Sequence, residues 1–121
     1  ILYVGGNDLS LGYSENKINE LFKSLINQIR MKFPNCTIFS ISIKPSKHRI
    51  DKMNSIKTLN RIMKNELRKT PKSSFINIFD KFIDKKGNII SKYFLIDRLH
   101  LSQSGYNIWA DEVRKSLNSS L

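Results

Sequence analysis

The chain has a single cysteine, Cys36, and no apolar run near the roughly 20 residues that a membrane-spanning helix needs. One cysteine excludes an internal disulfide, and its place beside the apolar stretch 37–43 indicates a small buried side chain. Repeats, linkers and low-complexity segments are also absent from the sequence. The 121 residues therefore predict one small domain.

Acidic residues are scarce, with 10 Asp and Glu against 21 Lys and Arg and a formal net charge of +11. The excess lies between Lys44 and Lys72, where ten basic residues meet only Asp51 and Glu66. Such a field attracts nucleic acid or anionic lipid. No nucleic-acid motif accompanies it, and aromatic residues do not alternate with the basic ones. A solvated helix face is therefore favoured, with no specific nucleic-acid partner, and a basic binding surface stays the alternative.

Groups that would hold a metal or cofactor are also missing. One of the two histidines, His48, falls in a polar loop and is expected to be solvated. Two histidines, one cysteine and scattered acids do not form a metal site. The sequence implies no cofactor.

The chain opens on Ile1 and not on methionine, and residues 1–4 already have the continuous apolar pattern of a buried strand. A natural chain seldom begins inside a strand, which predicts that N-terminal strands are missing. Any signal peptide would lie in the missing part, so cytoplasmic and exported locations both stay open.

The pattern alternates strand and helix, which predicts an α/β fold built as a three-layer parallel sheet with helices on both faces. Expected strands cover 1–4, 37–43 and 75–79, and expected helices cover 14–33, 53–68 and a stretch starting near residue 103. Residues 84–96 are expected to form a loop. The first and last helices are expected to turn inward Ile18, Leu21, Phe22, Leu25, Ile26, Ile29 and Phe33, and Tyr106, Trp109, Ala110, Val113 and Leu117.

Polar residues follow the predicted strands, at the sheet edge where ligands of open parallel sheets bind. The turn 5–8 lies there, as do residues 44–46 and the region after Phe79. Farther along, Asp97 and His100 stand three residues apart just before the last helix. A histidine general base needs a carboxylate to fix its tautomer. Taken alone, this spacing is a weak signal, because a surface turn or an aspartate at the N-terminus of a helix explains it as well.

Two segments carry a family resemblance that covers the whole chain. Residues 97–106, Asp-Arg-Leu-His-Leu-Ser-Gln-Ser-Gly-Tyr, resemble the last conserved block of the SGNH (GDSL-like) hydrolases, an esterase and lipase family. Residues 5–8, Gly-Gly-Asn-Asp, resemble its Gly-x-Asn-Asp block. Residues 42–46, Ser-Ile-Lys-Pro-Ser, with Arg49 are similar to a stretch in one bacterial branch of the family.

The resemblance implies a flavodoxin-like fold, no cofactor and ester hydrolysis by a Ser-His-Asp mechanism. In it His100 takes the serine proton, Asp97 orients His100, and Asn7 helps to form the oxyanion hole. Asp8 is expected to be a turn or helix-entry residue. The three site residues Asn7, Asp97 and His100 are expected at one rim of the sheet. The ester belongs to a lipid, a short acyl chain or an acetylated sugar, and the sequence leaves these three open.

The chain departs from the family pattern in two respects. It has neither the Gly-Asp-Ser-type block with the nucleophilic serine nor the block with the second oxyanion donor, a glycine. Ser10, Ser42 and Ser46 are expected near the same rim, but none stands in a nucleophile-like turn. Arg98 replaces a residue that is commonly small. The 121 residues alone are therefore expected to be inactive.

Two further interpretations stay open. A truncated or degenerate, non-catalytic module would keep the motifs without activity, and the basic binder described above is the other. If the strand at 1–4 lacks a neighbour, its exposed edge also predicts self-association.

Overall fold

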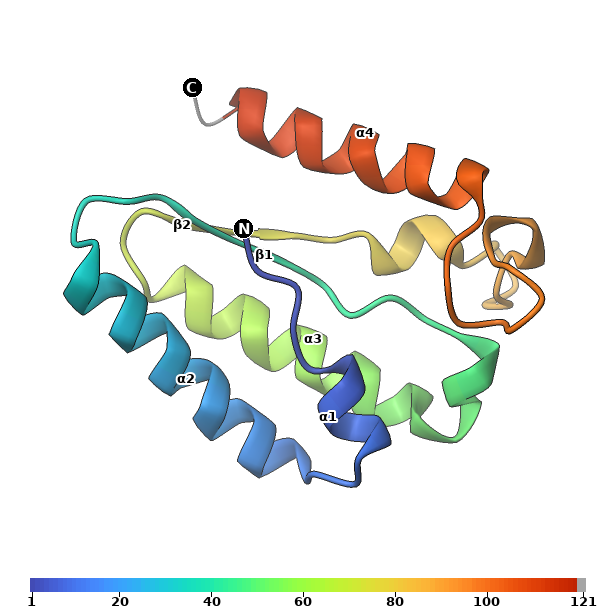
Figure 1. Cartoon of the computed structure of the whole chain (residues 1–121), viewed down its shortest axis with the longest axis horizontal. Helices are drawn as coiled ribbons and strands as arrows, with labels where there is room; N and C mark the ends of the chain where they lie inside the picture. The colour runs from blue at the N-terminus through green and yellow to red at the C-terminus, as the bar shows by residue number, and fades with distance from the viewer. Residues whose placement is uncertain (120–121) are drawn as a thin grey trace.

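The computed structural model describes residues 1–119, and it has three layers with a small parallel sheet in the middle. Strands β1 (Ile38–Ile41) and β2 (Ser73–Ile76) pair in parallel. On the other side of β1, Leu2 forms a single parallel bridge to Ser40. Helices α2 (Glu15–Lys32) and α3 (Met53–Arg68) cover one face and α4 (Gln103–Ser119) covers the other (Figure 1). The predicted fold class is confirmed.

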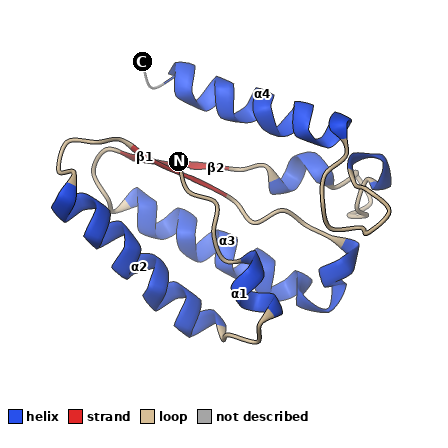
Figure 2. Cartoon of the chain, in the orientation of Figure 1, coloured by secondary structure: helices blue, strands red, loops and turns tan. Residues whose placement is uncertain are grey.

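Helices α2 and α4 begin at a serine cap, whereas α3 follows Lys52, whose side chain makes no capping hydrogen bond. Ser14 Oγ accepts a hydrogen bond from the Lys17 N–H (3.1 Å), and Ser102 Oγ accepts one from the Gly105 N–H (3.3 Å). Helix α3 spans the predicted 53–68. Between these elements lie four short helical segments, which Figure 2 distinguishes from the strands: α1 (Gly6–Ser10), η1 (Lys47–Lys52), η2 (Phe79–Phe82) and η3 (Ser91–Tyr93).

Two apolar cores lie on opposite faces of the sheet, because alternate residues of a strand point to opposite sides. In β1, Ile38 joins the core under α2 and α3, whereas Phe39 and Ile41 join the core under α4. The first core also holds Phe22, Ile56, Leu59 and Met63, and the second holds Ile76, Ile78, Phe82 and Leu101. Cys36 is half-buried against the first core.

The strands are shorter than predicted because side chains replace ladder partners at their ends. Beyond β1, the Asn60 amide accepts a hydrogen bond from the Ile43 N–H (2.7 Å) and donates one to the Ile43 carbonyl (3.0 Å). Beyond β2, Ser42 Oγ accepts from the N–H groups of Ile78 (2.9 Å) and Phe79 (3.0 Å). The predicted strand 75–79 is therefore wrong by several residues, since β2 ends at Ile76.

The prediction of a buried strand at 1–4 is wrong in extent. Only Leu2 bridges to β1, through its N–H to the Phe39 carbonyl (2.7 Å) and its carbonyl to the Ile41 N–H (2.8 Å). Ile1 is 66% exposed and Tyr3 is 38% exposed. The segment lies along one edge of the sheet, and no other strand within residues 1–119 pairs with its outer side.

Three side chains predicted to face inward are exposed instead. Leu21 lies at the margin of the apolar stripe of α2, and Phe33 lies past the last turn of that helix, where Lys32 sits over its ring. Tyr106 belongs to the first turn of α4 and faces a cavity, so it does not join the core. Helical periodicity identifies the stripe correctly but does not reveal how far the neighbouring layer extends over it.

Candidate active site

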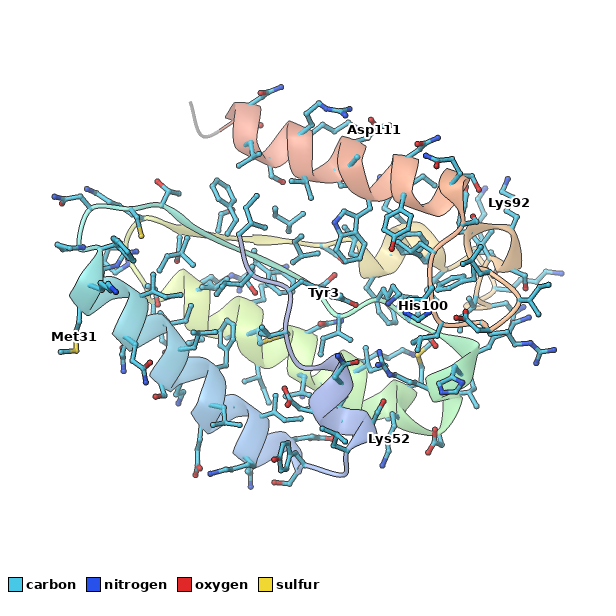
Figure 3. The ribbon with its side chains drawn as sticks, viewed as in Figure 1. Tyr3, Met31, Lys52, Lys92, His100 and Asp111 are labelled. Atoms are coloured by element: carbon cyan, nitrogen blue, oxygen red, sulfur yellow. The ribbon has the colours of Figure 1, made fainter. Side chains whose placement is uncertain are left out.

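A cavity of about 620 Å³ opens beyond the ends of β1 and of the Leu2 segment, between α1 and the start of α4. Figure 3 shows two residues of its wall, Tyr3 and His100, in this space. Its volume falls in the range of roughly 300–1,000 Å³ that small-molecule sites occupy. The wall is formed by residues 3–8 together with Lys44, Arg49, Leu99, His100, Leu101, Tyr106 and Trp109.

Asp97 and His100 form a close pair beside this cavity. The imidazole Nδ1 lies 2.6 Å from Asp97 Oδ2. Asp97 Oδ1 accepts hydrogen bonds from the backbone N–H groups of Leu99 (2.9 Å) and His100 (3.0 Å). These bonds, the one to the imidazole above all, lower the pKa of Asp97 to about 2, so the carboxylate stays ionised at neutral pH.

The pairing determines which imidazole nitrogen is available for chemistry. A carboxylate can only accept, so Nδ1 carries the proton and Nε2 of the neutral ring carries a lone pair. Among residues 1–119, no group makes a hydrogen bond to Nε2, and the His100 side chain is 66% exposed. His100 can thus accept a proton at Nε2 from a group that enters the cavity.

The loop that carries the pair is tied to neighbouring segments. Arg98 has a left-handed backbone (φ 60°), and its carbonyl accepts from Ser46 Oγ (3.0 Å) and from the His48 N–H (3.3 Å). Gly105 packs directly under the Tyr93 carbonyl, where a Cβ atom would collide with that oxygen. The glycine of the 97–106 motif is therefore needed for close helix–loop packing and not for contact with a ligand.

Asn7 lies in α1 on the opposite wall of the same cavity. Its Oδ1 accepts a hydrogen bond from Arg49 Nη2 (2.8 Å). An arginine has only donors, so this contact fixes which end of the amide is oxygen. The Asn7 Nδ2 donors have no hydrogen-bond partner among residues 1–119. Gly6 lies flat against the Arg49 guanidinium, where a Cβ would come within 2.7 Å of Nη1.

The structure thus brings Asn7 and His100 to one cavity, with Asp97 held behind His100. The three serines near the rim are engaged elsewhere. Ser10 Oγ accepts from Arg49 Nε (2.7 Å), and Ser42 and Ser46 are fully buried in the hydrogen bonds given above. None of these three hydroxyls contacts His100. Asp8 lies in the first turn of α1 and lines the cavity.

Sequence reasoning places residues 44–46 at the ligand-binding edge of the sheet but misses that Lys44 and Arg49 are buried cations. Both fall in the basic stretch expected to be a solvated face, yet they are 8% and 6% exposed and line the cavity. Tyr3, whose hydroxyl lies 3.4 Å from Lys44 Nζ, is expected from the sequence only as part of a strand. The sequence does mark Asn60, the partner of both backbone groups of Ile43, because it is a polar residue within the apolar stripe of Ile56, Leu59 and Met63.

Within residues 1–119, no three His, Cys, Asp or Glu side chains are grouped so as to hold a metal ion. No helix in the same part of the chain is long and apolar enough to cross a membrane.

Comparison by sequence gives no match, either to a family model or to a curated protein. Comparison by structure finds several similar proteins. A family 3 carbohydrate esterase from Clostridium thermocellum is 30% identical, with a TM-score of 0.64 over 98% of this chain. A GDSL-like lipase from Bacteroides thetaiotaomicron is 19% identical, with a TM-score of 0.76 over 98% of the chain. The OSK domain of Drosophila Oskar is 16% identical, with a TM-score of 0.84 over 95%.

The alignments cover only part of these neighbours: 56% of the carbohydrate esterase, 61% of the GDSL-like lipase and 59% of the OSK domain. The neighbours include esterases and a lipase, and also a domain whose description names no hydrolysis, as expected when one fold serves several functions. The resemblance drawn from residues 5–8 and 97–106 is confirmed in the fold: this chain has the architecture of the SGNH, or GDSL-like, hydrolases.

Proposed function

We propose that the chain forms part of a serine esterase, an acyl hydrolase in which His100 is the general base. The observation that supports this most is the Asp97–His100 pair, whose free Nε2 shares a cavity with the Asn7 amide. In the proposed reaction, His100 removes the proton of a serine hydroxyl, and that oxygen attacks the ester carbonyl. Asp97 holds the imidazole and stabilises its protonated form.

The Asn7 amide supplies the matching electrostatic group. Its Nδ2–H donors would meet the negative charge that develops on the carbonyl oxygen in the tetrahedral intermediate. Arg49 is a positioning residue in this scheme, since its contact with Oδ1 turns Nδ2 toward the cavity. When the intermediate collapses, His100 returns the proton to the leaving alcohol, and water then hydrolyses the acyl-serine by the same route.

The proposal places the nucleophilic serine and the second oxyanion donor outside residues 1–121. Ser10, Ser42 and Ser46 are poor substitutes because their hydroxyls already bind Arg49 or backbone groups. The 121-residue chain alone should therefore show no turnover of aryl or short-chain esters above background.

The test is the hydrolysis of 4-nitrophenyl acetate by the longer natural protein that carries these residues. Asn7→Ala should lower kcat by about 10²–10³-fold, as loss of one oxyanion donor does. Asp97→Asn should lower it by about 10⁴-fold, because the amide favours the wrong tautomer of His100. Asn65→Ala, an exposed change on α3, is the control for the substitutions. Equal activity of Asp97→Asn and the unsubstituted protein would refute the mechanism.

A further inference from the structure

Two buried cations form one side of the candidate active site. Lys44 is 8% exposed and Arg49 is 6% exposed, and both line the cavity that holds Asn7 and His100. Removing a charged side chain from water is costly unless an opposite charge compensates it. Their surroundings therefore decide whether they serve the fold or a ligand.

The direct partners of both cations are neutral. Lys44 Nζ lies 3.4 Å from the Tyr3 hydroxyl and 5.6 Å from the centre of its ring. Arg49 donates from Nε to Ser10 Oγ (2.7 Å) and from Nη2 to Asn7 Oδ1 (2.8 Å). No carboxylate of residues 1–119 forms an ion pair with either cation within 4.0 Å.

Two carboxylates lie near the cavity, and neither of them pairs with Lys44 or Arg49. Asp97 is committed to His100, and Asp8 lines the wall but forms no ion pair with Lys44 or Arg49. The pKa of Lys44 reflects this environment: burial first, and Arg49 next, lower it to about 8, against a smaller opposing effect of Asp97. The ammonium is thus still mostly charged at neutral pH, and the charged side chains that line the cavity, Lys44, Arg49 and Asp8, sum to +1.

We propose that Lys44 and Arg49 form a subsite for an anionic oxygen group, carboxylate or phosphate, so that the ester taken by this site carries an acidic group close to the ester bond. The ester part of this inference rests on the proposed function. Among the substrate classes left open by the sequence, it favours an acetylated acidic sugar or a phospholipid over a neutral ester. Arg49 contacts Asn7, so the anion would lie next to the oxyanion position.

Binding to the 121-residue chain tests the subsite without any activity. Monomethyl succinate and methyl butyrate are esters of similar size, and only the first is anionic; inorganic phosphate is the phosphate probe. We expect monomethyl succinate or phosphate to shift the NMR signals of Lys44, Arg49 and Asn7 saturably, and methyl butyrate to leave them unchanged. Tighter binding of monomethyl succinate would indicate a carboxylate, as in an acidic sugar, and tighter binding of phosphate would indicate a phospholipid.

Lys44→Met should weaken binding of the anionic probe at least about tenfold, the equivalent of about 1.4 kcal/mol. Lys64→Met removes the same charge from an exposed position on α3 and should leave the affinity unchanged. Equal binding of the neutral and anionic esters by the unsubstituted chain, or equal weakening by both variants, would overturn the subsite. Anion binding at Lys44 without ester hydrolysis by the longer protein would refute the proposed function and leave the subsite standing.

Discussion

At the scale of single residues, the site depends on donors and acceptors that cannot exchange roles. Arg49 can only donate, so Asn7 must present its oxygen to the guanidinium and its amide N–H groups elsewhere. Asp97 can only accept while ionised, so His100 must present a proton at Nδ1. Asn7 and His100 are thus each oriented by a charged neighbour, and the orientation of His100 depends on Asp97 staying ionised.

The low pKa of Asp97, about 2, gives a pH prediction. Since the folded pKa lies below the ordinary 3.8, the carboxylate stabilises the fold above about pH 4, and that contribution is lost as pH falls toward about 2. The difference in free energy of unfolding between the chain and Asp97→Asn, measured with urea, should therefore shrink across this range. Asp51→Asn controls for loss of one exposed charge. A difference that stays constant from neutral pH to about 2 would show that the Asp97 bonds do not form.

At the scale of elements, the strand ends depend on two polar side chains that belong to other parts of the chain. Asn60 of α3 completes the hydrogen bonding of Ile43, which is fully buried, and Ser42 does the same for Ile78 and Phe79. These contacts direct the chain out of β1 so that Lys44 arrives at the cavity.

Asn60→Ala should destabilise the chain by about 2–6 kcal/mol, because it leaves a buried N–H and a buried carbonyl of Ile43 unpaired at about 1–3 kcal/mol each. Asn65→Ala, at an exposed position of the same helix, should change the free energy of unfolding by less than about 0.5 kcal/mol. Urea unfolding of both variants measures this. Similar values for the two would mean that Asn60 is not the partner of Ile43.

The same contacts explain which parts of the structure could be predicted from sequence. Helices α2 and α3 could be predicted because the apolar periodicity of both, and the Ser14 cap of α2, involve residues that are close together in the chain, and α3 matches its predicted bounds. Strand ends do not, because their partners lie 17 residues (Ile43 and Asn60) and 36 residues (Ser42 and Ile78) apart. Likewise the Asp97–His100 pair is local and could be recognised, whereas the burial of Lys44 depends on Tyr3, 41 residues away.

At the scale of the whole molecule, the chain combines an open sheet edge with a charge of +11. Apart from the two bonds of Leu2, residues 1–4 make no backbone hydrogen bond to β1, and Ile1 and Tyr3 are exposed there. Strand edges of this kind pair with other strands. Charge repulsion opposes pairing, but salt screens it over about 8 Å at physiological ionic strength.

The 121-residue chain is therefore expected to self-associate more strongly as salt rises, which sedimentation velocity at low and moderate salt can measure. Ile1→Lys places a charge on the edge and should reduce association. Met31→Lys adds the same charge at an exposed position of α2 and should have little effect. A monomer at both salt concentrations would show that this edge does not recruit a second chain.

The central claim, that His100 activates a serine at this cavity, is tested most directly by the rate at which a fluorophosphonate labels the longer protein that the proposal implies. The account predicts one labelled serine, outside residues 1–121, and a rate that falls steeply in His100→Ala. Labelling at the same rate in that variant, or labelling of Ser10, Ser42 or Ser46, would contradict it.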